Sequence, residues 1–241
     1  MNEQRITLQK IISASKRIVF FGGAGVSTES GIPDFRSSNG IYNQKYQYAP
    51  ETVVSHSFFL QKTELFYDFY KKHMMFLDSK PNPAHLTLAR LEKKGKLTAV
   101  ITQNIDGLHQ RAGSENVLEL HGSIYRNYCM NCQQFYSAAD VKKASGIPRC
   151  SCGGIIKPDV VLYEEGLDNA TIQKSIAAIQ AADTLIIGGT SLLVYPAAGF
   201  VDYFSGKQLI VINKEETAKK VSADLFIRDA IGTVFKELDR L

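Results

Sequence analysis

Short apolar runs alternate with amphipathic stretches along this chain. The apolar runs are rich in β-branched and aromatic residues and predict buried strands at 17–21, 97–102, 117–120, 184–187, 208–212 and 225–227. The intervening patterns predict helices at 7–15, 83–94 and 169–181. This alternation is typical of βαβ units and predicts an α/β fold with a Rossmann-like parallel sheet.

Two stretches interrupt the α/β alternation, at residues 32–77 and 127–158. We expect a discontinuous nucleotide-binding domain formed by 1–31, 78–126 and 159–241. The helical excursion 32–77 and a metal-binding module at 127–158 then form a small domain together. Within the excursion, aromatic residues at helical spacing predict one helix over 58–77 that packs against the sheet, with an apolar substrate groove as the alternative.

Composition places the chain among ordinary globular proteins. Its 241 residues are 44% hydrophobic and 22% charged. The net charge of +4 is small and the lysines are scattered, which argues against a nucleic-acid-binding surface. The sequence contains no apolar signal segment and no apolar run long enough to span a membrane, so we expect a cytoplasmic protein with no membrane partner.

A glycine-rich turn follows the first predicted strand. Gly23 and Gly25 begin a dinucleotide-binding pattern, but Thr28 stands where the third glycine belongs. A tight βα connection is therefore an alternative to a phosphate-binding loop. Phe35 and Arg36, just after a proline, favour the phosphate-binding loop because arginine binds phosphates with two hydrogen bonds.

Four cysteines form two close pairs, Cys129 with Cys132 and Cys150 with Cys152, separated by 17 residues. In a reducing compartment this spacing predicts a structural zinc ribbon with four thiolate ligands and no open coordination position. Four unrelated buried thiols and a redox pair are the alternatives. A single residue separates Cys150 from Cys152, which tightens the second turn.

Polar residues follow several of the predicted strands. Ligands bind beyond the carboxyl ends of strands in open α/β sheets, so these residues predict a nucleotide cleft. They are Gln103, Asn104 and Asp106 after the second strand, His121 after the third, Thr190 and Ser191 after the fourth, and Asn213 after the fifth.

Two of these residues have distinct alternatives. Asp106 either caps a short helix or serves the site, and the segment alone favours neither. His121 is the candidate neutral-pH base of this region, whereas His109 is expected to pack within the loop helix.

Taken together, six motifs in order resemble the sirtuins, the NAD-dependent protein lysine deacylases. They are Gly-Ala-Gly-Val-Ser-Thr-Glu-Ser-Gly-Ile-Pro-Asp-Phe-Arg-Ser (23–37), Thr-Gln-Asn-Ile-Asp-Gly-Leu-His (102–109), Glu-Leu-His-Gly (119–122), Lys-Pro-Asp-Val-Val (157–161), Gly-Thr-Ser-Leu (189–192) and Val-Ile-Asn (211–213).

The resemblance implies which residues contact NAD. The diphosphate and adjacent ribose would be held by Ala24, Gly25, Thr28 and Arg36, and the anomeric carbon shielded by Phe35. The nicotinamide half would be bound by Gln103, Asn104, Ile105, Asp106 and His121, and the adenosine half by Thr190, Ser191, Asn213 and Ala230 or Ile231.

The resemblance also implies the reaction. The acyl oxygen of acetyl-lysine attacks the ribose carbon as nicotinamide leaves, and His121 acts as general base with Asn104 in the catalytic site. The products are deacetylated protein, nicotinamide and O-acetyl-ADP-ribose. Acetyl-lysine proteins or peptides would add a strand along Val160, Val161, Leu162 and Tyr163, with the loop 193–197 opposite.

Three rival functions differ in chemistry. A mono-ADP-ribosyltransferase would pass the same activated ribose to a protein side chain. A zinc-ribbon nucleic-acid binder is disfavoured by the weak charge, and a nicotinamide dehydrogenase by Thr28 and by the missing ribose carboxylate.

Overall fold

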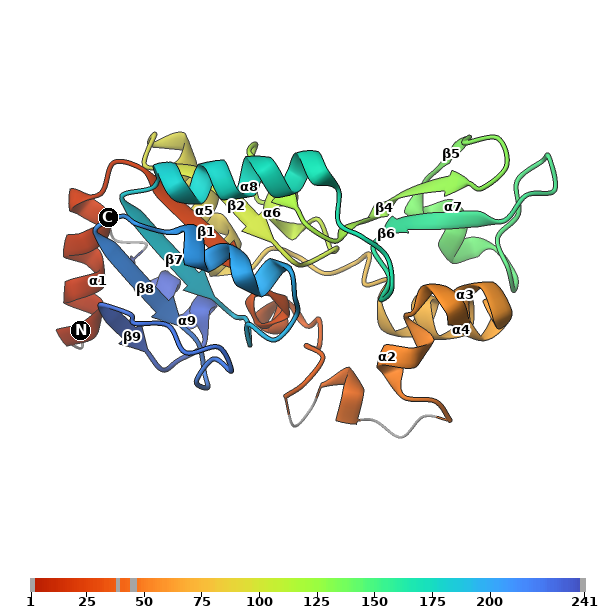
Figure 1. Cartoon of the computed structure of the whole chain (residues 1–241), viewed down its shortest axis with the longest axis horizontal. Helices are drawn as coiled ribbons and strands as arrows, with labels where there is room; N and C mark the ends of the chain where they lie inside the picture. The colour runs from red at the N-terminus through yellow and green to blue at the C-terminus, as the bar shows by residue number, and fades with distance from the viewer. Residues whose placement is uncertain (1–2, 38–39, 44–46, 239–241) are drawn as a thin grey trace.

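A six-stranded parallel sheet forms the centre of the larger part of the molecule. The computed structural model describes residues 3–37, 40–43 and 47–238, so 1–2, 38–39, 44–46 and 239–241, which fall within the predicted domains, lie outside it. Within the described residues, the strand order is β3-β2-β1-β7-β8-β9 (Figure 1). The strands are β1 (Ile18–Gly22), β2 (Leu97–Thr102), β3 (Val117–Glu119), β7 (Thr184–Gly188), β8 (Gln208–Ile212) and β9 (Leu225–Ile227). The predicted strands and the Rossmann-like sheet are confirmed.

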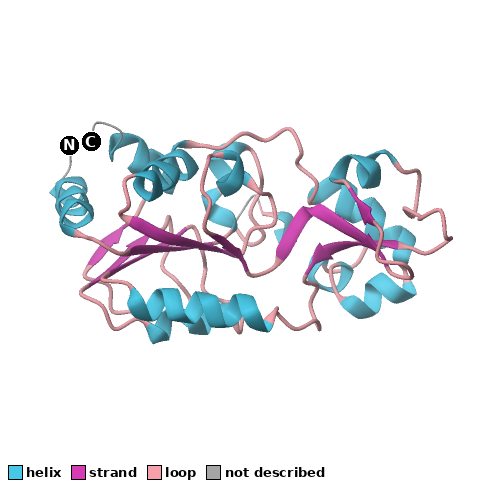
Figure 2. Cartoon of the chain, turned by 90° about the horizontal axis from the view of Figure 1, so that it is seen from above, coloured by secondary structure: helices cyan, strands magenta, loops and turns pink. Residues whose placement is uncertain are grey.

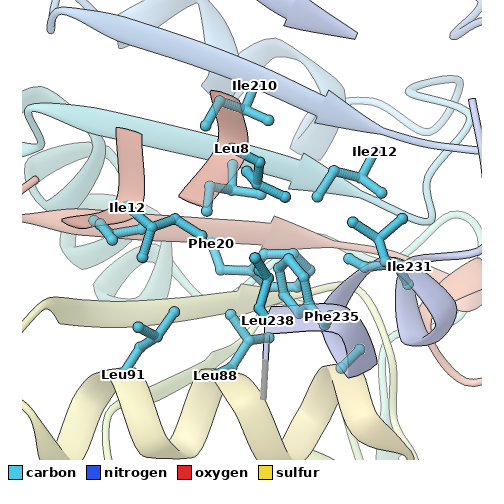
Figure 3. Close-up of a cluster of buried hydrophobic side chains, with 14 of the residues drawn as sticks. Leu8, Ile12, Phe20, Leu88, Leu91, Ile210, Ile212, Ile231, Phe235 and Leu238 are labelled. Atoms are coloured by element: carbon cyan, nitrogen blue, oxygen red, sulfur yellow. The ribbon is translucent and has the colours of Figure 1, made fainter. Parts of the chain in front are cut away.

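Helices cover both faces of this sheet (Figure 2). One face carries α1 (Glu3–Ala14), α5 (Pro83–Lys93) and α9 (Ile231–Glu237), and the other carries α8 (Asn169–Ala181) and the 3₁₀ helix η4 (Ala197–Tyr203). Strand alternation divides the core accordingly. Phe20 packs with Leu8, Leu88 and Phe235 on the first face (Figure 3), whereas Phe21 belongs to the cluster on the second.

A second, antiparallel sheet has the order β5-β4-β6 and lies at the far end of the molecule (Figure 1). Its strands are β4 (Gly122–Cys129), β5 (Phe135–Tyr136) and β6 (Ile156–Val160). It lies beside α2 (Pro50–Val53), α3 (His56–Gln61), α4 (Thr63–His73) and α7 (Ala138–Lys143). One apolar cluster joins the two excursions, because Phe59 and Tyr67 of the first pack with Cys129 and Ile156 of the second.

The predicted single helix over 58–77 is wrong. Lys62 leaves the helical region, with φ −136° and ψ 49°, and divides the segment into α3 and α4. Each part has its own start, and Ser55 caps α3 by accepting a hydrogen bond from the Phe58 N–H. The aromatic residues pack in the small antiparallel core instead of against the large parallel sheet.

The order of the large sheet fixes where a ligand can approach. The chain runs outward from β1 to β2 and β3 on one side, and from β7 to β8 and β9 on the other. The loops after the adjacent strands β1 and β7 therefore leave in opposite directions, and such a switch point is where open α/β sheets bind nucleotides. None of the described helices combines the length and hydropathy that crossing a membrane requires.

Candidate active site and metal centre

The loops after β1 and β7 lie against each other at the switch point. The Gly25 N–H donates to Gly189 O at 2.8 Å. A Cβ on Gly25 would lie 2.8 Å from Gly189 Cα, and a Cβ on Gly189 would lie 2.3 Å from Val26 N. Gly189 also has a φ of +57°, which favours glycine. The glycines therefore bring together the two loops that carry the predicted NAD contacts.

Two short 3₁₀ turns, η1 (Ala24–Val26) and η2 (Thr28–Ser30), form the loop after β1. Thr28 donates its hydroxyl to Gly25 O at 3.0 Å, so its side chain folds back over the turn. Ala24, Gly25 and Thr28 are all partly exposed. The structure thus places these predicted NAD contacts at the accessible side of the loop, and their contact with a dinucleotide stays a prediction.

A buried hydrogen-bond network links this loop to the end of β2. The Ser27 hydroxyl donates to Asp106 Oδ2 at 2.6 Å and accepts from Asn104 Nδ2 at 3.1 Å. Asn104 and Asp106 are each 8% exposed. Sequence reasoning assigned no role to Ser27. Ser27 lies within the sirtuin-like motif 23–37, and this was the one sign in the sequence that it could have a role. Its contact with Asp106 arises only in the folded chain.

Asp106 lies two residues before the short helix α6 (Leu108–Arg111), whose N-cap residue is Gly107. Its Oδ1 accepts a hydrogen bond from the Leu108 N–H at 2.9 Å, so Asp106 makes an Asx-type contact with the start of the helix without being its N-cap residue. Burial raises the pKa of the carboxyl group, and the hydrogen bonds from Ser27 and Leu108 oppose that rise. Ile105 is partly exposed beside it. The predicted contact of Ile105 and Asp106 with nicotinamide remains a prediction.

His121 lies between β3 and β4, where β6 approaches it. Its Nδ1 is 2.9 Å from the carbonyl oxygen of Gln103. A carbonyl oxygen only accepts, so Nδ1 carries the proton in the neutral ring and Nε2 keeps its lone pair. Burial lowers the pKa of His121, partly offset by the Gln103 hydrogen bond, so the ring is neutral at pH 7. The geometry therefore gives Nε2 the character of a proton acceptor.

His109, by contrast, is 1% exposed. It belongs to α6 and packs against His85 of α5 with ring centroids 4.7 Å apart, so it is a packing residue of the loop helix, as expected. Gly122 explains the close approach of β6 to His121. It has a φ of +76°, and a Cβ there would lie 1.9 Å from Asp159 O.

Gln103 and Asn213 join the strand ends through Thr190. The Gln103 Nε2 donates to Thr190 Oγ1 at 3.1 Å, and the Asn213 Nδ2 donates to Thr190 O at 3.2 Å. Ser191, the next residue, is partly exposed. Residues from β2, β7 and β8 thus meet at one edge, as the strand-end argument predicted.

Ala230 and Ile231 differ in environment. Ile231 is 2% exposed and belongs to the core beneath the sheet, whereas Ala230 is partly exposed as the N-cap residue of α9. Of the two alternatives for the adenine contact, the accessible one is Ala230. That contact stays a prediction.

Phe35 and Arg36 meet the predicted peptide segment. Arg36 Nη2 donates to Tyr163 Oη at 3.3 Å, and its guanidinium lies 5.1 Å from the Tyr42 ring centroid. Phe35 packs edge-on against Tyr42, and the Tyr42 and Tyr163 hydroxyls are 3.2 Å apart. The contacts of Phe35 and Arg36 with NAD stay predictions, but both residues lie beside the peptide segment.

The predicted peptide segment is extended. Val161 N–H donates to His121 O at 3.1 Å, and Tyr163 N–H donates to Val54 O at 3.0 Å. Val160 and Leu162 are buried in the small core at 5% and 3% exposure. Val161 is partly exposed and Tyr163 is 36% exposed, so they are the accessible side chains of the segment. In the loop 193–197, Leu193 and Tyr195 are 50% and 65% exposed, and the position of this loop opposite the peptide segment stays a prediction.

The four cysteine thiols converge on one point. Their Sγ atoms all lie within 4.8 Å of one another, with separations of 3.5 Å for Cys129–Cys152 and Cys132–Cys150 and 3.6 Å for Cys132–Cys152. Sulfur atoms at about 2.3 Å from a tetrahedral zinc are about 3.8 Å apart, whereas a disulfide needs about 2.05 Å. The donor set fits one structural zinc, and the tight Cys150-x-Cys152 turn is compatible with it.

Comparison with known proteins identifies relatives of this chain. The Sir2 family model matches residues 23–196. An NAD-dependent protein deacetylase of Clostridium acetobutylicum is 60% identical over 233 residues, covering 95% of both chains.

Two solved structures have the same fold. A Sir2 variant with a deacetylated p53 peptide and 3′-O-acetyl-ADP-ribose has a TM-score of 0.89 at 38% identity, covering 98% of this chain and 97% of the other. A Sir2 complex with a p53 peptide and NAD⁺ has a TM-score of 0.86 at 38% identity, covering 97% and 96%.

Proposed function

Because this chain belongs to the Sir2 family, we propose that it is an NAD-dependent protein lysine deacetylase. It transfers the acetyl group of acetyl-lysine to ADP-ribose and releases nicotinamide, O-acetyl-ADP-ribose and deacetylated protein. Two findings support this reaction over ADP-ribosylation of protein. A relative is named NAD-dependent protein deacetylase, and Sir2 structures contain a p53 peptide with NAD⁺ or with acetyl-ADP-ribose.

The observation that carries the proposal is that His121 forms hydrogen bonds with two predicted binding segments, one through its ring and one through its backbone carbonyl. Its ring is oriented by the carbonyl of Gln103, which belongs to the predicted ribose-binding segment. Its own carbonyl accepts the Val161 N–H of the predicted peptide segment. One residue thus contacts both the predicted ribose-binding segment and the predicted peptide segment, which supports a catalytic role for its proton-accepting Nε2 between them.

Bound NAD supplies an electrophilic ribose carbon with nicotinamide as leaving group. His121 Nε2 accepts a proton from a ribose hydroxyl, and its low pKa keeps it free to do so at neutral pH. Asn104 and Asp106 are held by Ser27 so that their polar atoms have fixed directions before substrate binds. The acetyl oxygen of acetyl-lysine is an amide oxygen and therefore a weak nucleophile. Holding it in a fixed orientation to the ribose carbon supplies much of the rate acceleration.

The zinc ligands take no part in this chemistry. Four thiolates fill the coordination shell of a tetrahedral zinc and leave no position for water. We propose that the metal stabilises the turns that carry β4 and β6 and thereby the peptide segment.

The partners we propose are acetylated proteins and peptides. Sir2 structures with acetylated and propionylated peptides support a peptide ligand. The accessible side chains of Val161 and Tyr163 on one side, and of Leu193 and Tyr195 on the other, supply apolar contact for the peptide.

The predicted division into domains stays a proposal: a large domain of 1–31, 78–126 and 159–241 and a small domain of 32–77 and 127–158. The shared core of the two excursions supports it. A cytoplasmic location is proposed because four cysteines that converge on a metal site, with no disulfide between them, are typical of proteins in a reducing compartment.

The test is to incubate the protein with NAD and an acetyl-lysine peptide and to follow all products by mass spectrometry. Equal amounts of nicotinamide, O-acetyl-ADP-ribose and deacetylated peptide are expected. His121→Gln is the matched variant, because it keeps a polar side chain but has no basic ring nitrogen. ADP-ribose attached covalently to protein, with the peptide still acetylated, would establish the transferase instead.

A further inference from the structure

One buried side chain holds the loop after β1 from the side of α5. Asn82 is 5% exposed and is the N-cap residue of α5. Its Oδ1 accepts a hydrogen bond from the Ala84 N–H at 2.9 Å. Its Nδ2 donates to Val26 O at 2.7 Å and to Ser30 Oγ at 2.9 Å. Both hydrogen bonds that the amide nitrogen donates therefore go to the loop, while the amide oxygen serves the start of α5.

The two donated bonds exceed what a helix cap requires. An N-cap needs only an acceptor oxygen, which serine, threonine or aspartate supplies equally well. The amide Nδ2 adds nothing to the end of α5, because it points to Val26 and Ser30, more than fifty positions earlier in the chain. Its partners show that it acts on the loop.

The hydrogen bonds from Asn82 to Val26 and Ser30 lie on either side of residues that belong to the proposed NAD site. Between Val26 and Ser30 lie Ser27, which holds Asn104 and Asp106, and Thr28, a predicted NAD contact. The same loop is fixed at its start by the bond from Gly25 to Gly189. The amide of Asn82 thus fixes the far end of a turn whose near end is already tied to β7.

We propose that Asn82 is a positioning residue that holds η1 and η2 in the conformation that binds the dinucleotide. The inference rests on the proposed function, because this loop contacts NAD only if the chain uses NAD. Asn82 itself acts through the loop and touches neither substrate.

Asn82→Ser separates the two roles, because serine still caps α5 but cannot donate to both Val26 O and Ser30 Oγ. We expect the Kd for NAD and for ADP-ribose, measured by calorimetry, to rise about tenfold, equivalent to about 1.4 kcal/mol. The kcat at saturating NAD and the KM for the acetylated peptide are expected to stay at wild-type values, because the groups that react are not displaced once NAD is bound.

Two further variants control the experiment. Asp168→Ala removes the cap of α8, where Asp168 accepts from the Thr171 N–H at 2.7 Å. This helix packs on the opposite face of the sheet from Val26. The variant is expected to lower the melting temperature without changing the Kd for NAD. Ser30→Ala removes one loop contact and leaves the cap intact, and it is expected to raise the Kd less than Asn82→Ser does.

The outcomes are distinct. Wild-type affinity for NAD in Asn82→Ser, with or without a lower melting temperature, would show that Asn82 is only a helix cap and would overturn the inference. If Asn82→Ser does not fold, an unchanged Kd in Ser30→Ala overturns it equally, and a raised Kd supports it. Failure of the wild-type protein to bind NAD would instead refute the proposed function and with it this inference.

Discussion

Acidification from pH 7 to pH 5 is predicted to weaken the fold through a buried histidine at the start of α5. His85 is fully buried, packs 4.7 Å from the ring of His109, and accepts the Asn82 N–H through Nδ1 at 3.3 Å. Burial lowers its pKa to about 4. The pKa of a histidine in an unfolded chain is near 6.5. Between about pH 4 and pH 6.5, His85 is therefore protonated in the unfolded chain but neutral in the folded protein.

The sign and size of the effect follow from linkage. The pKa in the folded state is lower than in the unfolded state, so the stabilisation is complete above pH 6.5 and is lost as the pH falls towards 4. With pKa values of about 4 and 6.5, His85 alone lowers the free energy of unfolding by about 2 kcal/mol between pH 7 and pH 5. His109, whose pKa burial also lowers well below its ordinary value, adds in the same direction.

The assay is urea unfolding of the wild type and of His85→Gln at both pH values. Glutamine at this position still accepts the Asn82 N–H in a capping box but does not titrate, so the variant is expected to lose about 2 kcal/mol less on acidification. The zinc site is common to both proteins, so its own pH dependence cancels in the comparison. An equal pH dependence in the wild type and His85→Gln would refute the reasoning.

The other predictions concern the site and the metal. His121→Ala is expected to lower kcat by about 10²–10⁴ while NAD still binds. For the wild-type enzyme, kcat/KM is expected to fall on acidification at a midpoint below the ordinary histidine value of about 6.5, since burial lowers the pKa of His121 in the free enzyme; a midpoint above that value would contradict the assignment. Removal of zinc by a chelator, or Cys150→Ser, is expected to unfold the small antiparallel sheet, because metal binding is worth about 10–16 kcal/mol in such modules; an unchanged melting curve would count against it. Gly189→Ala places a Cβ 2.3 Å from Val26 N and is expected to cost about 1–3 kcal/mol and to weaken NAD binding, whereas Gly95→Ala, with open space around its Cβ, is expected to leave NAD binding unchanged.

Local sequence patterns were sufficient for the large sheet. Each of its strands has an apolar run bounded by polar or turn residues, and burial on both faces of a parallel sheet demands such runs. The patterns failed in the helical excursion. Aromatic residues at helical spacing predicted one helix, but whether the backbone stays helical at Lys62 depends on the separate packing of α3 and α4.

The site divides in the same way. The residue types and their places after strands were legible in the sequence, because strand ends in a parallel sheet share one edge. The spacing of Cys129, Cys132, Cys150 and Cys152 likewise predicted a cluster that the Sγ separations confirm. The roles of Ser27 and Asn82 were not legible, since their partners lie far away along the chain.

The sequence by itself determined which elements form and which chemical groups are available, because hydrophobic periodicity, turn residues and ligand spacing act over short distances. Only the tertiary structure decided which nitrogen of His121 carries the proton, which carboxylate Ser27 holds, and which faces of the peptide segment are accessible. Those properties depend on hydrogen-bond geometry and burial between residues distant in sequence, and the chain acquires them only when it closes on itself.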